Sequence, residues 1–259
     1  MCLLARLATV SAQIAVALIG AAGRMGSEVC RAVESADGLR LVGRYDVGDD
    51  LGDLSGADVV VEFSVPDASL DNVLHCVGEG VHVVVGTTGW HEEKLERLRS
   101  ALTDRPGVGV LIAPNFAIGA ILMMAFAAKA ARFYESVEII ELHHPNKVDA
   151  PSGTAARTAR LIGDARAAAD MGPVPDATTS DLQGARGARI EGVSVHSVRL
   201  RGLVAHQEVI FGAEGETLTI RHDSFDRISF MPGVIEGVRQ VADHPGLTVG
   251  LEHYLGLGE

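Results

Sequence analysis

The sequence has few cysteines, no long apolar segment and an excess of acidic over basic residues. Three cysteines, none at a metal-site spacing, argue against a disulfide framework and favour a reducing compartment such as the cytoplasm. No uncharged apolar run reaches the roughly 18 residues of a membrane span, so we expect none. The formal net charge of −12 argues against a general surface for nucleic acid or anionic membranes.

The N-terminal half alternates between two hydrophobic patterns. Continuously apolar segments predict strands, and amphipathic segments between them predict helices. Such an alternation indicates a parallel sheet covered on both faces, which is a Rossmann-type, doubly wound α/β fold. The predicted strands are Ile14–Ile19, Leu39–Tyr45, Val59–Phe63, Val81–Val85 and Val108–Ile112, and the helices are Arg24–Ser35, Asp67–Gly78 and His91–Leu102.

The pattern changes after about Pro114, where consecutive strands lack helices between them. This order favours an antiparallel or mixed sheet in an α+β domain. The expected helices are Ile118–Tyr134 and Thr154–Ala168, Asp170–Gly187 is a long loop, and the strands are Val137–Leu142, Val193–Leu200, Val204–Phe211 and Glu216–His222. A hairpin-type turn, GAEGE, joins the last two strands.

These patterns predict a chain of three parts. Residues 1–12 are an N-terminal extension, too short in their apolar centre for a signal peptide. Residues 13–116 form a dinucleotide-binding domain, and residues 117–227 form an α+β domain. The tail, 228–259, contains a predicted helix at Gly233–Ala242 and a predicted strand at Leu247–Leu251. It could join either domain, and we assign it to the first.

A glycine-rich turn lies between the first strand and the first helix. Its glycines would let the backbone approach a pyrophosphate, whose charge the helix N-terminus would stabilise. Asp46 ends the second strand, where an acid could hold ribose hydroxyls, although it could also simply open the turn DVGDD. Arg24 and Arg44 could accept the 2′-phosphate of NADPH, so the choice between NADH and NADPH stays open. The turn consists of Gly20, Ala21, Ala22, Gly23, Arg24, Met25 and Gly26.

Two further loops follow predicted strands of the same sheet. Open α/β sheets bind ligands beyond the carboxyl ends of their strands, so both loops are candidates for coenzyme binding. Either could equally be an ordinary turn. They consist of Gly86, Thr87 and Thr88, and of Ala113, Pro114, Asn115 and Phe116.

The fifteen residues ELHHPNKVDAPSGTA, from Glu141 to Ala155, collect several reactive groups. His143 can deliver a proton near neutral pH, and Lys147 supplies a fixed positive charge. The segment from Ser152 to Thr154 opens a helix, where free N–H groups could bind a carboxylate. Ser152 could instead serve only as an N-cap.

Two other chemistries remain alternatives for this segment. His143, His144, Glu141 or Asp149 could bind a metal, but neighbouring strand residues point to opposite faces and the two histidines converge poorly. Ser152 could act in a Ser-His-Asp hydrolase, although the chain lacks a G-x-S-x-G elbow there.

The fifteen-residue segment closely resembles the signature of the dihydrodipicolinate reductases (4-hydroxy-tetrahydrodipicolinate reductases) of lysine and diaminopimelate biosynthesis. The resemblance also covers GAAGRMG, VVGTTG, APNFAIG and GLVAHQEVIFG. It implies reduction of dihydrodipicolinate, a small anionic cyclic dicarboxylate, to tetrahydrodipicolinate with NADH or NADPH. It also implies a homotetramer assembled through the mixed sheet.

The resemblance further implies a role for each site residue. His143 is the proton donor and acceptor, and Lys147 is a second proton donor. The substrate pocket would contain His144, Lys147, Ser152, Gly153 and Thr154. The glycine turn, Asp46 and the two loops named above would hold the coenzyme, and no metal is expected.

Two other functions fit the same two-domain plan. A semialdehyde dehydrogenase would need a nucleophilic cysteine, but Cys30 and Cys76 lie in helical patterns. A redox-sensing module without turnover would bind the coenzyme and would not need the His-Lys pair.

Overall fold

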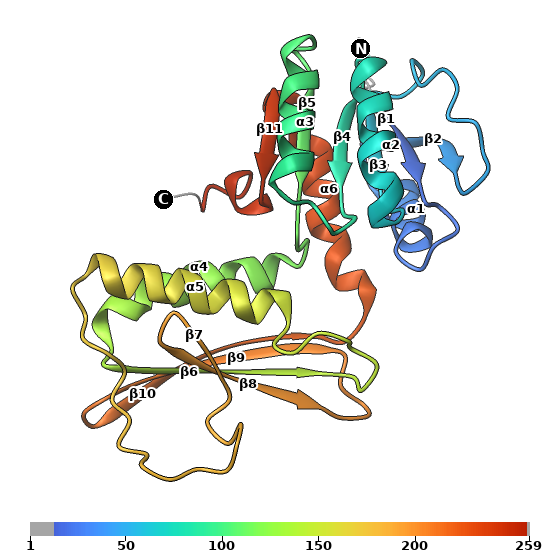
Figure 1. The fold of residues 1–259 in the computed structure, drawn as a ribbon. Coiled ribbons are helices and arrows are strands. Elements are labelled where there is room, and N and C mark those ends of the chain that lie inside the picture. The colour runs from blue at the N-terminus through green and yellow to red at the C-terminus, as the bar shows by residue number, and fades with distance from the viewer. Residues whose placement is uncertain (1–12, 258–259) are drawn as a thin grey trace, which may run out of the picture. The chain divides into compact units, whose positions relative to one another are not determined.

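The computed structural model describes residues 13–257, and the predicted N-terminal extension therefore lies outside the described residues (Figure 1). The chain forms two compact units. The first contains the residues up to Pro114 together with Gly233–Tyr254, and the second contains Asn115–Pro232 and the residues from Leu255 onward.

The first unit is built on a six-stranded sheet with the strand order β11-β5-β4-β3-β1-β2. Every pairing in this sheet is parallel, which confirms the predicted Rossmann-type fold. The inner strands of a parallel sheet are buried on both faces, and this explains why their sequences are mainly apolar. The strands are β1 (Ile14–Ile19), β2 (Leu39–Tyr45), β3 (Val59–Glu62), β4 (His82–Val85), β5 (Gly109–Ile112) and β11 (Gly246–Val249).

Helices cover both faces of this sheet. On one face Val73 of α2 and Leu98 of α3 share a core with strand residues such as Val83, and each fully buried side chain of this kind contributes about 1.5–3 kcal/mol. On the other face α6 packs closely, because Gly237 lies against Val84 and Leu111. The helical segments are α1 (Gly26–Ser35), α2 (Pro66–Gly78), α3 (Glu92–Thr103), α6 (Met231–Gln240), and the 3₁₀ turns η3 (Val241–Asp243) and η4 (Leu251–His253).

The second unit contains a five-stranded mixed sheet with the order β10-β9-β6-β8-β7. The central strand β6 pairs in parallel with β8 and antiparallel with β9, as the predicted mixed sheet requires. The strands are β6 (Ser136–His143), β7 (Ala188–Ile190), β8 (Val193–Arg199), β9 (Ala205–Ala213) and β10 (Glu216–Ser224). Strand β7 was not predicted, because three residues are too few for a period-two pattern.

Two long helices lie side by side over one face of the mixed sheet (Figure 1). They are α4 (Ile118–Ala130) and α5 (Gly153–Ala168), and the 3₁₀ turns are η1 (Ala131–Phe133) and η2 (Arg227–Phe230). The helix predicted to reach Tyr134 thus changes to a 3₁₀ turn after Ala130. No helix among residues 13–257 is sufficiently long and apolar to span a bilayer.

The predicted final strand, Leu247–Leu251, ends earlier than expected. Strand β11 stops at Val249, and Gly250 has φ 108°, a conformation that directs the chain into η4.

Candidate active site

The glycine turn after β1 is shaped by two close backbone approaches. Gly20 has φ +84°, and a Cβ atom there would lie 2.3 Å from the carbonyl oxygen of Phe63. A Cβ atom on Gly26, the first residue of α1, would lie 2.0 Å from the carbonyl oxygen of Gly20. Real Cβ atoms do not approach so closely, so only glycine fits at both positions. The turn therefore leaves its backbone open to a ligand at the start of α1.

Asp46 is tied to this turn through its carboxylate. Ile19 and Tyr45 are paired in the sheet, so Gly20 and Asp46 leave their strands at the same edge. The N–H group of Ala22 donates to Asp46 Oδ2 at 2.6 Å. Backbone hydrogen bonds from Val47 and Ala22 lower the pKa of Asp46, so this carboxylate is ionised at neutral pH. Asp46 also opens a turn, because its N–H group donates to Asp49 Oδ2 at 2.8 Å.

A pocket of about 490 Å³ adjoins Asp46. Arg44 lies on its wall and forms an ion pair with Glu34. Contacts with the Cys30 thiol and the Glu34 carboxylate raise the pKa of Arg44, which stays charged. The lining residues are Ala21, Ala22, Ser27, Cys30, Arg31, Glu34, Arg44, Tyr45, Asp46 and Asp49.

The two later loops leave the same edge of the sheet. Val85 pairs with Ile112, so Gly86 and Ala113 follow neighbouring strand ends. Thr87 is buried, and its Oγ1 atom has no hydrogen-bond partner among the described residues. A buried hydroxyl without a partner is costly, and a bound polar group could satisfy it.

Asn115 contacts the fifteen-residue segment. Its Oδ1 atom accepts a hydrogen bond from the Ala117 N–H group at 2.8 Å, and its Nδ2 atom donates to Thr154 Oγ1 at 3.3 Å. This side chain thus links the start of α4 to the start of α5.

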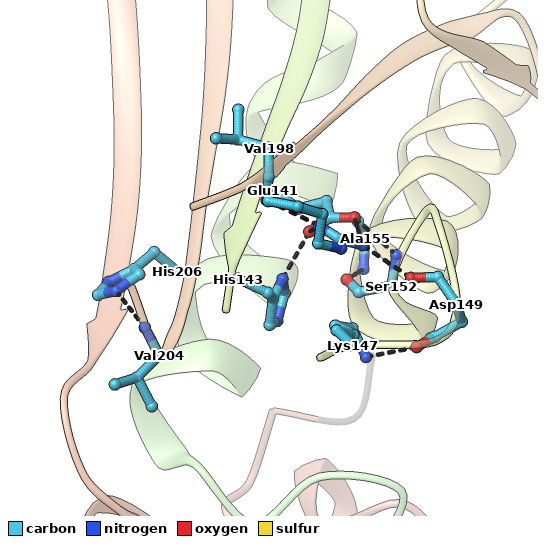
Figure 2. Close-up of polar contacts among 10 residues, drawn as sticks. Glu141, His143, Lys147, Asp149, Ser152, Ala155, Val198, Val204 and His206 are labelled. Carbon is cyan, nitrogen blue, oxygen red and sulfur yellow. Dashed lines mark hydrogen bonds and ion pairs between the residues drawn. The ribbon is translucent and has the colours of Figure 1, made fainter. Parts of the chain in front are cut away.

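His143 is the last residue of β6, and its ring points toward Glu141 (Figure 2). The two residues lie on the same face of the strand because they are two positions apart. His143 Nδ1 lies 2.5 Å from Glu141 Oε2. Glu141 is fully buried, and it accepts hydrogen bonds of 2.8 Å to each oxygen from the Arg199 guanidinium. The Ser152 N–H group donates to Glu141 Oε1 at 3.1 Å.

Burial and charge set the protonation of this pair. Burial alone would raise the pKa of Glu141, but hydrogen bonds from Arg199, Ser197 and His143 outweigh it and lower that pKa. Burial lowers the pKa of His143, and the nearby cations Lys147 and Arg199 act in the same direction, against the opposite effect of Glu141. At neutral pH the pair is therefore a carboxylate beside a neutral imidazole.

Lys147 lies in the loop that follows β6. Its Nζ atom lies 2.7 Å from Asp149 Oδ1, and this contact lowers the pKa of Asp149. The side chain of Lys147 keeps 22% of its surface exposed, so its charge is accessible to a ligand. The Asp149 carbonyl accepts a 2.7 Å hydrogen bond from Arg199, which ties the loop to the buried pair.

Helix α5 begins immediately after this loop. Ser152 is its N-cap and accepts a hydrogen bond from the Ala155 N–H group at 3.2 Å. Space is open around Gly153, the first residue of the helix. His144 is exposed, directly after the end of β6. The segment thus combines a histidine, a lysine and a helix N-terminus in one place.

Sequence reasoning missed one important member of this site. Arg199 lies 58 residues from Glu141, and only the pairing of β6 with β8 brings the two together. Glu141 was weighed only as a possible metal ligand, although the spacing Glu-x-His on a strand could have revealed its contact with His143. Among the described residues, no group of three or more His, Cys, Asp or Glu could hold a metal ion.

A parallel sheet with a glycine turn and an acid at the next strand end is typical of oxidoreductases that use a nicotinamide nucleotide. Residues 14–116 match the family model for the N-terminus of dihydrodipicolinate reductase, and residues 119–255 match the model for its C-terminus. The chain belongs to the dihydrodipicolinate reductase family, whose members use NADH or NADPH.

Individual relatives are similar along nearly their whole length. The chain is 64% identical to a 4-hydroxy-tetrahydrodipicolinate reductase of Cutibacterium acnes, over 94% of this chain and 99% of the relative. It is 63% identical to a 4-hydroxy-tetrahydrodipicolinate reductase of Thermobifida fusca, over 94% of this chain and 100% of the relative. Among solved structures, the dipicolinate-bound dihydrodipicolinate reductase of Paenisporosarcina sp. TG-14 is similar, with a TM-score of 0.82 and 38% sequence identity. The match covers 93% of this chain and 99% of that structure.

Proposed function

We propose that the protein reduces dihydrodipicolinate (4-hydroxy-tetrahydrodipicolinate) to tetrahydrodipicolinate in lysine and diaminopimelate biosynthesis. The observation that carries this proposal is the segment Glu141–Ala155. It combines a buried acid–histidine pair, an accessible lysine cation and a helix start, in a chain 64% identical to a named reductase. The dipicolinate in the related structure supports a planar cyclic dicarboxylate as the substrate class.

The first unit would hold the coenzyme. The glycine turn would take the pyrophosphate, and Asp46 would take the adenosine ribose hydroxyls. When bound, the nicotinamide ring supplies a hydride. The residues that would bind the coenzyme are Gly20, Ala21, Ala22, Gly23, Arg24, Met25, Gly26, Asp46, Gly86, Thr87, Thr88, Ala113, Pro114, Asn115 and Phe116.

The charge at the ribose pocket favours NADH over NADPH. Asp46 is ionised and would repel a 2′-phosphate, while Arg44 is already engaged by Glu34. A second acid, Asp49, adds to the same wall of the pocket.

The second unit would bind the substrate and handle the proton. Lys147 and the N–H groups of Gly153 and Thr154 would offset the substrate carboxylates, and a donor at a helix start contributes roughly 3 kcal/mol by analogy with single oxyanion donors. His143 or Lys147 would supply the proton that completes reduction of a conjugated C=C–C=N system. His144 and Ser152 would contact the substrate.

We assign the coenzyme to residues 13–116 with 228–259, and the substrate and subunit contacts to residues 117–227. The mixed sheet supports a homotetramer, because the face opposite α4 and α5 includes the apolar side chains of Ile140 and Ile210, which are only partly buried in one copy of the chain. Light scattering on the purified protein measures the mass of the assembly, and hence the number of subunits, directly. Cys30 and Cys76 are free thiols in the described part of the chain, which is compatible with the cytoplasm as its compartment.

A coupled assay tests the proposed reaction. The substrate is generated in situ, and loss of coenzyme absorbance is followed with NADH and with NADPH in parallel. We expect oxidation of both, with the higher kcat/KM for NADH. Oxidation of neither coenzyme would exclude the reaction, and coenzyme binding without turnover would favour a sensing module instead.

A further inference from the structure

Glu141 accepts every hydrogen bond that is made to its side chain. Two come from the Arg199 guanidinium, one from the Ser152 N–H group and one from the Ser197 hydroxyl. A guanidinium and a backbone amide have no acceptor to offer, so both carboxylate oxygens must carry lone pairs toward them. The charged guanidinium contacts both oxygens and lowers the pKa of Glu141, so the side chain is ionised and has no proton to give to His143.

The contact of Glu141 with His143 determines the tautomer of the histidine. Nδ1 of the ring lies 2.5 Å from Glu141 Oε2, which is a hydrogen-bond distance. Because the carboxylate is only an acceptor, the proton of this bond must lie on Nδ1. In the neutral ring Nε2 then carries a lone pair, and it gains a proton only in the imidazolium form.

Resting on the proposed function, we propose that Glu141 and Arg199 are positioning residues that hold His143 as the Nδ1–H tautomer. Nε2 is then the nitrogen that exchanges a proton with the substrate. Arg199 fixes the carboxylate at both oxygens, and its third bond, to the Asp149 carbonyl, holds the Lys147 loop in the same arrangement.

The charges around His143 explain why the carboxylate is needed. The positive charges of Lys147 and Arg199 disfavour the imidazolium form of His143, whereas the negative charge of Glu141 favours it. The other nearby carboxylate, Asp149, forms an ion pair with Lys147. Replacing Glu141 by glutamine removes the stabilising anion and leaves both cations. The amide can also donate to Nδ1, which would reverse the tautomer and place the ring proton on Nε2.

Nuclear magnetic resonance tests the tautomer without any turnover. Histidine is labelled with ¹⁵N, and the His143 signal is assigned by its loss in His143→Gln. We expect the Nδ1–H pattern in the parent protein and the Nε2–H pattern in Glu141→Gln. An Nε2–H pattern in the parent would overturn the inference even if the protein reduces its substrate.

Kinetics test whether the pair acts through His143. We expect Glu141→Gln to lower kcat about 100-fold, which lies in the range of one general acid–base group, with little change in KM. In the His143→Gln background the same substitution should cost less than about threefold, because residues that act as one unit are not additive. Because the imidazolium is the form that gives the proton, the alkaline limb of the kcat/KM profile should move to lower pH. Equal losses in both backgrounds would show a purely structural role.

Glu138→Gln is the matched control. Glu138 lies on the same strand but on the opposite face, and it also contacts an arginine, Arg186, and a histidine, His196. We expect parent-like kcat and an unchanged His143 spectrum. Arg199→Lys, which keeps the charge and loses the two-pronged contact, should lie between the parent and Glu141→Gln. The ¹⁵N histidine spectrum and the thermal unfolding of each variant show whether it has folded.

Discussion

Substituting Gly26 by alanine should impair the coenzyme site through a single methyl group. The new Cβ atom would lie 2.0 Å from the carbonyl oxygen of Gly20 and 2.9 Å from the Cα atom of Ala21. Both neighbours are backbone atoms of the glycine turn, so no side chain can rotate away. The turn itself must move.

The size of this movement follows from the contact distance. Ordinary contacts of a Cβ atom begin at 3.4 Å, so the oxygen and the methyl group must separate by about 1.4 Å. Overpacking of this kind costs about 1–3 kcal/mol, which exceeds the gain of up to about 1 kcal/mol from the higher helix propensity of alanine. The displaced turn also loses its alignment with a pyrophosphate. We therefore expect the Kd for NADH to rise at least about tenfold, which corresponds to a loss of about 1.4 kcal/mol of binding free energy.

A graded series of glycine variants makes this test specific. Titration calorimetry with NADH and thermal unfolding are measured for each variant. At Gly23 the new Cβ atom would lie 3.1 Å from the Gly20 oxygen, so Gly23→Ala should have an intermediate effect. At Gly78, the last residue of α2, nothing lies within 4 Å, so Gly78→Ala should bind like the parent. Parent-like affinity and stability for Gly26→Ala would refute the steric reasoning.

Two further predictions concern charge. Lys147→Ala should lower kcat/KM at least about 100-fold and leave the affinity for the coenzyme unchanged. Lys129 is exposed, and Lys129→Ala serves as the control. Parent-like turnover by Lys147→Ala would contradict the role of Lys147. The Gly109 N–H group donates to His82 Nδ1 at 2.9 Å, and burial lowers the pKa of His82, as it does for His143 and His222. The unfolded chain therefore binds more protons below about pH 6.5, so the free energy of unfolding should fall between about pH 7.5 and pH 5, and less so in His82→Gln. Urea unfolding across this range measures the slope, and a flat profile would contradict it.

Much of the first unit could be predicted because its signals are local. The inner strand β1 is apolar throughout, and β2, although it contains Arg40 and Arg44, also begins and ends where its sequence predicts. The predicted strands were wrong where a single residue changes the course of the chain, as Gly250 does after β11, or where a strand such as β7 is too short to show a periodic pattern. Such boundaries depend on neighbours that are distant in the sequence.

The candidate site divides in the same way. His143, Lys147 and the start of α5 lie within one segment of fifteen residues, so their proximity follows from the chain itself. The bond between Asp46 and Ala22 crosses from one strand end to another, and only the register of β1 with β2 makes it possible.

By itself, the sequence determined the class of fold and the glycine turn, and it proposed His143 and Lys147 as proton-handling residues, because each depends on residues close together in the chain. Only the tertiary structure decided the protonation state of His143. That state depends on Glu141 being buried and ionised, and therefore on Arg199, which the pairing of β6 and β8 brings across 58 residues. The pKa of a buried group is set by its neighbours in space, and sequence distance carries no information about them.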